Sequence, residues 1–236
     1  MKPFYTINAG EFMVGRLIEK NLPNVSLWFP AKDDGDDILI MDRTTRRICT
    51  VQIKVSRDYL ATHMDEMYHK DLKCCGWFTP QRSKIESSKS DFWILGLHTY
   101  ELSSLSLIIL TPSELLRRYT AIHGDAERLQ SYFWLTKTMK VFEARGLDKT
   151  EKMQIVDDSF SHDHRDFSNY LNDWAGIKAQ LKADEAHLRE TKNTEQADAP
   201  NYHAFGTFVT DPAEAGSAPK ASGSRSSGTF AKLKGN

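Results

Sequence analysis

The length of the apolar runs constrains the fold most strongly, because each run suits a β-strand and is too short to span a membrane. Helical patterns precede and follow these runs. The predicted order along the chain is therefore helix, three strands, helix, strand, strand and helix, which is typical of a mixed α/β fold. The predicted strands lie at residues 24–29, 37–42, 48–56, 91–97 and 105–110.

Three segments carry helix signals. Residues 8–21 place apolar side chains on one face, with Asn8 as a candidate N-cap and Glu11 three positions later, as in a capping box. Residues 111–119 begin with a threonine suited to the N-cap and a proline suited to the first helical position. The polar residues 61–75 are also predicted to be helical.

The rest of the chain divides by composition. Residues 126–182 are predicted to form a helical extension packed on a core of residues 1–125, with helices across 130–144 and 166–181. Residues 183–236 are rich in Ala, Ser, Gly, Pro and charge, which predicts disorder. This tail contains the triplet GTF twice, at Gly206 and Gly228, either by chance or as a docking motif for a protein partner.

Charge and cysteine content limit the protein classes. The 236-residue chain has a formal net charge of −1, so it lacks the basic excess of a non-specific nucleic-acid binder, although this does not exclude nucleic acid. Its three cysteines, Cys49, Cys74 and Cys75, suggest neither a disulfide framework nor paired metal ligands. We expect a cytoplasmic protein with no signal peptide and no membrane span.

Polar residues interrupt one of the most apolar strands. Alternation along residues 48–56 places Gln52 and Lys54 on one face and Val51 and Ile53 on the other. Asp37 opens the partner strand, and a short hairpin connection can bring it beside them. A carboxylate, an amide oxygen and the backbone carbonyl of Ile53 suit a hard cation, and the lysine could orient a water or neutralise charge on a phosphate.

These residues resemble the PD-(D/E)XK nuclease superfamily in its D…QxK variant. The resemblance covers roughly residues 8–120 and implies the restriction-endonuclease-like αβββαβ core with a mixed sheet. It also implies that Asp37 bridges the metal, that Gln52 is the second ligand and that Lys54 is the catalytic lysine. Glu11 would be the helix-borne acid. No proline precedes Asp37, and glutamine replaces the acid usual in the family.

The resemblance implies a metal-dependent endonuclease that hydrolyses phosphodiester bonds in DNA with Mg²⁺ or Mn²⁺. One alternative is a catalytically inactive nuclease fold that binds nucleic acid or a protein. Another is an interaction protein that acts through its C-terminal half and tail. The resemblance is also compatible with a homodimer, since many nucleases of this fold dimerise.

Each candidate residue also has a structural interpretation. The hairpin could be an edge with a solvated polar face, and a capping role explains Glu11 fully. Asp36 competes with Asp37 for the metal, and Asp33 and Asp34 could supply further charge. Asp42 is interpreted as a turn residue.

The remaining polar and aromatic motifs are less specific. Four arginines flank the hairpin and could contact phosphates or simply face solvent. The histidines at 162 and 164 lack metal-binding spacing and are assigned to a surface loop. Trp77, Trp93, Trp134 and Trp174 are interpreted as core residues. The arginines are Arg43, Arg46, Arg47 and Arg57.

Overall fold

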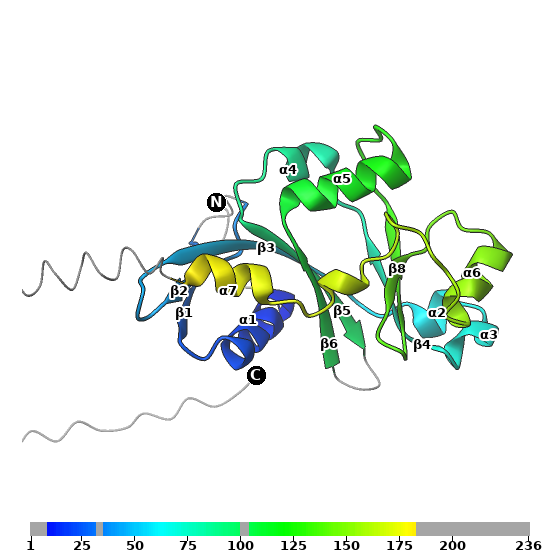
Figure 1. Cartoon of the computed structure of the whole chain (residues 1–236), viewed down its shortest axis with the longest axis horizontal. Helices are drawn as coiled ribbons and strands as arrows, with labels where there is room; N and C mark the ends of the chain where they lie inside the picture. The colour runs from blue at the N-terminus through cyan, green and yellow to red at the C-terminus, as the bar shows by residue number, and fades with distance from the viewer. Residues whose placement is uncertain (1–8, 32–34, 100–103, 183–236) are drawn as a thin grey trace, which may run out of the picture. The chain divides into compact units, whose positions relative to one another are not determined.

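Two β-sheets and the helices packed on them make up the part of the chain that the structure describes (Figure 1). The structure is a computed structural model that describes residues 9–31, 35–99 and 104–182. These residues belong to the first of two units into which the chain divides, residues 1–192. The tail predicted at 183–236, its GTF triplets and the candidate cap Asn8 lie outside the described residues.

The larger sheet has five strands in the order β1-β2-β3-β5-β6. Its first three strands form an antiparallel meander, β3 and β5 are parallel, and β5 and β6 are antiparallel. This confirms the mixed α/β class and all five predicted strands. They are β1 (Val25–Trp28), β2 (Ile38–Asp42), β3 (Ile48–Ser56), β5 (Phe92–Thr99) and β6 (Ser104–Leu110).

The turn between β2 and β3 is held by Asp42. Its carboxylate Oδ1 accepts hydrogen bonds from the backbone N–H groups of Thr44 and Thr45, at 2.8 and 2.7 Å. Arg46 follows with φ of 59°, the left-handed conformation that reverses the chain. Asp42 is therefore a turn residue, as predicted from the sequence.

Helices α1 (Ala9–Asn21) and α7 (Ala175–Leu181) cover one face of the large sheet (Figure 1). Val14 and Ile18 of α1 and Ile177 of α7 are fully buried in one cluster with the side chains of β1, β2 and β3 that alternate onto this face. The apolar periodicity of residues 8–21 therefore has the packing role that it predicted.

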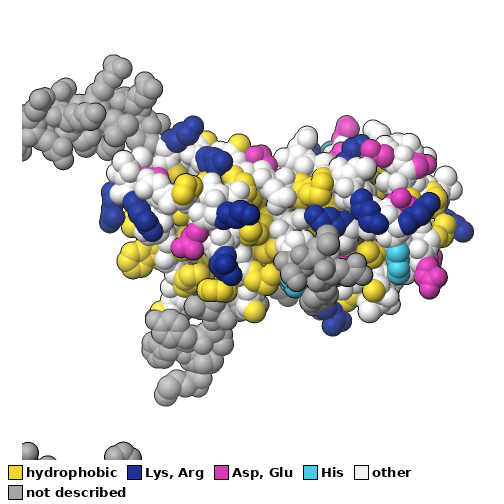
Figure 2. All heavy atoms as spheres, turned by 90° about the horizontal axis from the view of Figure 1, so that it is seen from below, with side chains coloured by type: hydrophobic (Ala, Val, Ile, Leu, Met, Phe, Trp, Pro, Cys, Tyr) yellow, Lys and Arg dark blue, Asp and Glu magenta, His cyan; other side chains and the backbone are white. Residues whose placement is uncertain are grey.

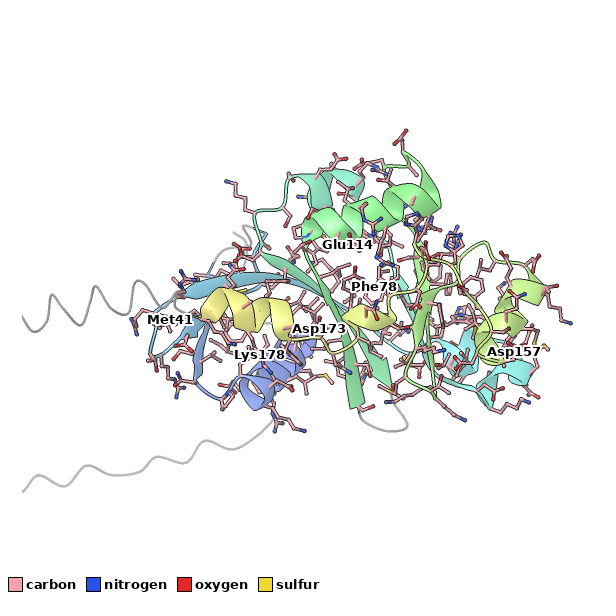
Figure 3. The ribbon with its side chains drawn as sticks, viewed as in Figure 1. Met41, Phe78, Glu114, Asp157, Asp173 and Lys178 are labelled. Carbon is pink, nitrogen blue, oxygen red and sulfur yellow. The ribbon has the colours of Figure 1, made fainter. Side chains whose placement is uncertain are left out.

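The other face of the large sheet is covered over β5 and β6. There α5 (Pro112–His123) and α4 (Arg82–Glu86) pack together with the second sheet in one apolar cluster. Thr111 caps α5 by accepting a hydrogen bond from the backbone N–H of Glu114, which confirms the predicted helix start. Figure 3 labels Phe78 within this covered part, and Met41 far from it, toward the end of the sheet that β1 and β2 form.

The second sheet has the order β4-β7-β8 and corrects two predictions. Residues 61–75 were predicted to be helical, but only α2 (Leu60–His63) and α3 (Glu66–His69) are, and β4 (Leu72–Phe78) follows. Residues 130–144 were also predicted to be helical, but they form β7 (Ser131–Thr136) and β8 (Val141–Glu143).

The physical reason for the error lies in tertiary pairing. The stretch from Ser131 to Thr136 is rich in aromatic residues that favour strands, and Met139 adopts φ of 64° in the turn that follows. Strand β7 pairs antiparallel with β4, which is distant in sequence. Residues 126–182 are therefore not a helical extension, because they supply two of the three strands of this sheet before α6 (Lys149–Val156), a 3₁₀ turn (Ser168–Tyr170) and α7.

Three smaller predictions concern the cysteines, the tryptophans and membrane-spanning helices. All three cysteines are free thiols and buried, and burial raises the pKa of Cys49 and Cys74 to about 12. Trp93, Trp134 and Trp174 lie in the cores, whereas Trp77 is half-buried. No described helix has the length and apolarity needed to cross a membrane.

Candidate functional site

Strand β3 presents Gln52 and Lys54 on the face of the sheet opposite α1. Val51 and Ile53 point toward α1 and α7 and are buried in the apolar cluster there. Gln52 is 8% exposed, whereas half of the Lys54 side chain is exposed. The strand is central, between β2 and β5, so these polar residues do not belong to a sheet edge.

Asp37 meets both side chains. It directly precedes β2, and its backbone N–H donates to the carbonyl of Val51 at 2.9 Å. Its carboxylate Oδ2 accepts hydrogen bonds from the Gln52 amide Nε2 and from the backbone N–H of Ile53, the latter at 2.6 Å. The Lys54 ammonium lies 3.8 Å from the same oxygen. Asp37, Gln52 and Lys54 are thus brought together at one end of β2.

The negative charge of Asp37 is offset by the donors around it. The Asp37 side chain is 14% exposed, so its charge is largely removed from water and depends on the donors around it. Two neutral N–H groups and one ammonium face a single carboxylate oxygen. Hydrogen bonds to a charged acceptor are stronger than neutral ones, so this arrangement holds the carboxylate in a fixed position.

The oxygen atoms near Asp37 are of the kind that bind a hard cation, but they carry little negative charge. Asp37 supplies a carboxylate, and Gln52 could supply an amide oxygen if its terminal torsion turned over, which costs little for such a broad two-fold torsion. The carbonyl of Ile53 points to the same side of β3 as its N–H, toward Asp37. Among residues 9–31, 35–99 and 104–182, no group of three His, Cys, Asp or Glu side chains could hold a metal.

Neighbouring acids are turned to other partners. The hydroxyl of Ser90 donates to Asp36, and Asp91 accepts the backbone N–H of Thr50 at 2.7 Å. Of the two acids that competed for the metal role, Asp37 is therefore the one that contacts Gln52. Asp33 and Asp34 lie outside the described residues.

Glu11 lies in the first turn of α1 and is half-buried. Its helix covers the face of the sheet opposite Gln52 and Lys54. Its role as a helix-borne acid remains a prediction.

The four predicted phosphate-binding arginines separate into different positions. Arg43 donates from Nε to the Ser26 hydroxyl at 3.1 Å, and the guanidinium of Arg47 donates to the carbonyl of Lys182 at 2.8 Å. The exposed Arg57 lies just past β3, with its guanidinium 4.7 Å from the ring centre of Tyr59. Arg46 belongs to the turn between β2 and β3, about 25 Å from Lys54 along the strand.

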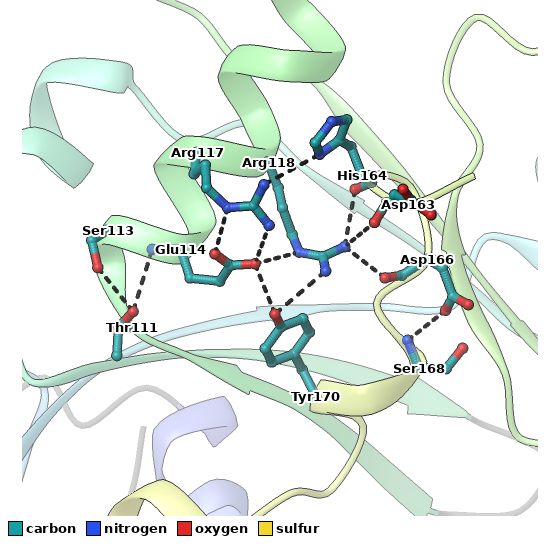
Figure 4. Close-up of polar contacts among 10 residues, drawn as sticks. All are labelled: Thr111, Ser113, Glu114, Arg117, Arg118, Asp163, His164, Asp166, Ser168 and Tyr170. Atoms are coloured by element: carbon teal, nitrogen blue, oxygen red, sulfur yellow. Dashed lines mark hydrogen bonds and ion pairs between the residues drawn. The ribbon is translucent and has the colours of Figure 1, made fainter.

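Sequence reasoning missed a polar network around Arg118 on α5 (Figure 4). The Arg118 side chain is 8% exposed and donates to Glu114 at 2.8 Å and to the hydroxyl of Tyr170. Hydrogen bonds, the largest from Arg117, lower the pKa of Glu114 to about 2. Arg118, Glu114 and the Tyr170 hydroxyl are all hydrogen-bonded to one another or to the loop, so the network anchors a loop to α5. The loop carbonyls that accept from Arg118 are those of Asp163, His164 and Asp166.

A second buried cluster surrounds Glu143 of β8. Its side chain is fully buried, and it accepts from Arg165 and from the backbone N–H groups of Tyr132 and Arg145. Burial raises the pKa of Glu143 to about 7, and the Arg165 charge opposes this increase. His123 Nε2 lies 3.9 Å from the Glu143 carboxylate, and burial lowers the pKa of His123 to about 4. Only pairing between distant segments creates this cluster, so no local sequence pattern could have indicated it.

Comparison of the chain with models of known protein families gives no match, and searches of curated proteins and of solved structures likewise return none.

Proposed function

We propose that the protein is a metal-dependent nuclease of restriction-endonuclease-like fold that hydrolyses phosphodiester bonds in DNA. One observation carries the proposal: the Asp37 carboxylate lies within contact distance of both the Gln52 amide and the Lys54 ammonium. The order of α1, the β1–β2–β3 meander and the parallel pair of β3 and β5 supports it, because this is the arrangement expected of the αβββαβ core.

The residues at the site would hold Mg²⁺ or Mn²⁺ through the carboxylate of Asp37, the amide oxygen of Gln52 and the carbonyl of Ile53. A bound divalent cation supplies a water of lowered pKa and neutralises charge on a phosphate. Lys54 is half exposed, so it can reach a phosphate or orient a water from the solvent side. The buried Gln52 amide and the N–H of Ile53 keep the Asp37 carboxylate in place before a substrate binds.

The decisive experiment measures cleavage of supercoiled plasmid and of single-stranded DNA with Mg²⁺, Mn²⁺ or no metal. Lys54→Ala and Asp37→Ala are each expected to lower the cleavage rate at least about 100-fold, because Lys54 would neutralise charge on the phosphate and Asp37 would hold the metal. Lys20→Ala is the matched control, since it removes an exposed cation from α1, on the other side of the sheet. Undiminished cleavage by Lys54→Ala would rule out the mechanism.

A second candidate function is nucleic-acid binding without cleavage on the same fold. The low charge of the described donor set favours it, because a neutral glutamine in place of an acid weakens attraction for Mg²⁺. Isothermal titration with Mg²⁺ discriminates between the two. Metal binding that disappears in Asp37→Asn supports the nuclease, and no binding in the wild-type protein supports the second candidate.

A further inference from the structure

The face of the large sheet that carries Gln52 and Lys54 differs along its length. Over β5 and β6 it is covered by α5 and the second sheet. Over β1, β2 and β3 two of its apolar side chains are exposed, Trp28 at 58% and Ile48 at 48%. We call this part the open face. It carries Trp28, Leu39, Ile48 and Lys54 together with the buried side chains of Met41 and Gln52.

Trp28 lies close to the candidate site on this face. It pairs with Leu39 across β1 and β2, and Leu39 is two residues beyond Asp37. Strand geometry therefore places the backbone of Trp28 about 8 Å from that of Asp37. An exposed aromatic residue thus lies on the strand next to Asp37, at the same end of the sheet.

Cations lie on both sides of Trp28. Arg43 is exposed, and its guanidinium is tied to Ser26, the neighbour of Trp28 on the same face of β1. In the other direction, past Leu39 and Asp37, lies Lys54, whose ammonium is 3.8 Å from the Asp37 carboxylate. In the view of Figure 2, Lys and Arg side chains spread across the width of the molecule with hydrophobic side chains between them.

An exposed indole with cations on either side suits unpaired bases. Each base has a π-face that stacks on an aromatic ring, while arginine and lysine contact the phosphates between bases. In a duplex these π-faces are hidden by neighbouring base pairs. Binding to a duplex depends mainly on many phosphate contacts, for which the open face has few cations.

We propose that the open face binds single-stranded nucleic acid, with an unpaired base stacked on Trp28 and the flanking phosphates near Arg43 and Lys54. Binding to the open face requires no metal and does not depend on the proposed function. Only the cleavage of a bound strand at Asp37 rests on that function. The substrate class of the nuclease would then be single strands, flaps or unpaired ends.

The test measures fluorescence anisotropy of labelled oligo-dT, oligo-U and a DNA hairpin duplex with the full chain in EDTA, where cleavage cannot occur. We expect both single strands to bind more tightly than the duplex, and the two arms distinguish DNA from RNA. Trp28→Ala is expected to weaken binding of the preferred strand roughly 5- to 100-fold. Trp28→Phe keeps a ring for stacking and should retain most of the affinity.

The matched control is Phe12→Ala, which removes another exposed aromatic side chain from α1, on the other side of the sheet. It should leave binding unchanged, and thermal melts confirm that each variant is folded. Duplex binding as tight as single-strand binding, or a folded Trp28→Ala that binds as the wild type does, overturns the proposal. So does a dimer in light scattering that Trp28→Ala dissociates without changing oligonucleotide affinity, because the face is then a contact between copies.

The outcome is separable from that of the proposed function. Single-strand binding in EDTA by a protein that never cleaves with metal supports the open face and refutes the nuclease. If the protein cleaves duplex plasmid with metal and Trp28→Ala does not change single-strand binding, the nuclease is supported and the open-face proposal is refuted.

Discussion

Two carboxylate–cation clusters in this molecule have similar components and opposite settings. Around Arg118 the cation is buried, and its donors reach Glu114, Tyr170 and three backbone carbonyls. Around Asp37 the carboxylate is largely buried, but the Lys54 cation is half exposed and lies 3.8 Å away. A fully satisfied buried network stabilises a fold, whereas a cation left open to solvent can act on a ligand.

The largest expected effect is on the buried network. Arg118→Ala should lower the free energy of unfolding by about 3–5 kcal/mol, because it leaves three carbonyls and a carboxylate without their buried donor. Chemical denaturation measures this. Arg117→Ala is the control, because Arg117 pairs with the same Glu114 but is 53% exposed, and it should cost at most about 1 kcal/mol. Equal costs for the two variants would contradict the comparison.

The next effect concerns pH and the buried pair of Glu143 and His123. Between pH 4.5 and about 7, folded Glu143 keeps a proton that the unfolded chain loses, so its contribution to stability decreases as pH rises. Between about pH 4 and 6.5, folded His123 is neutral whereas the unfolded residue is charged, so its contribution increases with pH. The two slopes oppose each other in the wild-type protein.

Substitution of one partner should expose the slope of the other. His123→Gln should lose on the order of 1–3 kcal/mol of stability as pH rises from 4.5 to 7, and Glu143→Gln should gain stability over the lower part of that range. Thermal melts at a series of pH values test this. Identical pH profiles for the two variants would show that these groups do not titrate as the burial requires.

The smallest effect on stability is expected at the open cluster. Gln52→Glu places a second carboxylate beside Asp37 and should cost about 1 kcal/mol without metal, because like charges are brought together. If the site holds Mg²⁺, millimolar Mg²⁺ should restore this loss by binding the folded state. Melting temperatures with and without Mg²⁺ measure the restoration. Gln52→Ala is the control, and a Mg²⁺ response equal to that of Gln52→Glu would mean that residue 52 is not a ligand.

The sequence alone determined the features that depend on near neighbours. Alternation placed Gln52 and Lys54 on one face of β3, and the hairpin brought Asp37 to them across 15 and 17 positions of the chain. The Thr111 cap and the Asp42 turn could be predicted for the same reason, because each satisfies backbone groups within three residues.

Only the tertiary structure decided the second sheet, the Arg118 network and the open face. Strand β7 is stabilised by β4, from which it is separated by more than fifty residues, so its own residues did not reveal whether they form a helix or a strand. Arg118 is buried by a loop some 45 residues away. Trp28 is exposed because α5 and the second sheet cover β5 and β6 and leave β1 open, which depends on packing between distant segments and on no local pattern.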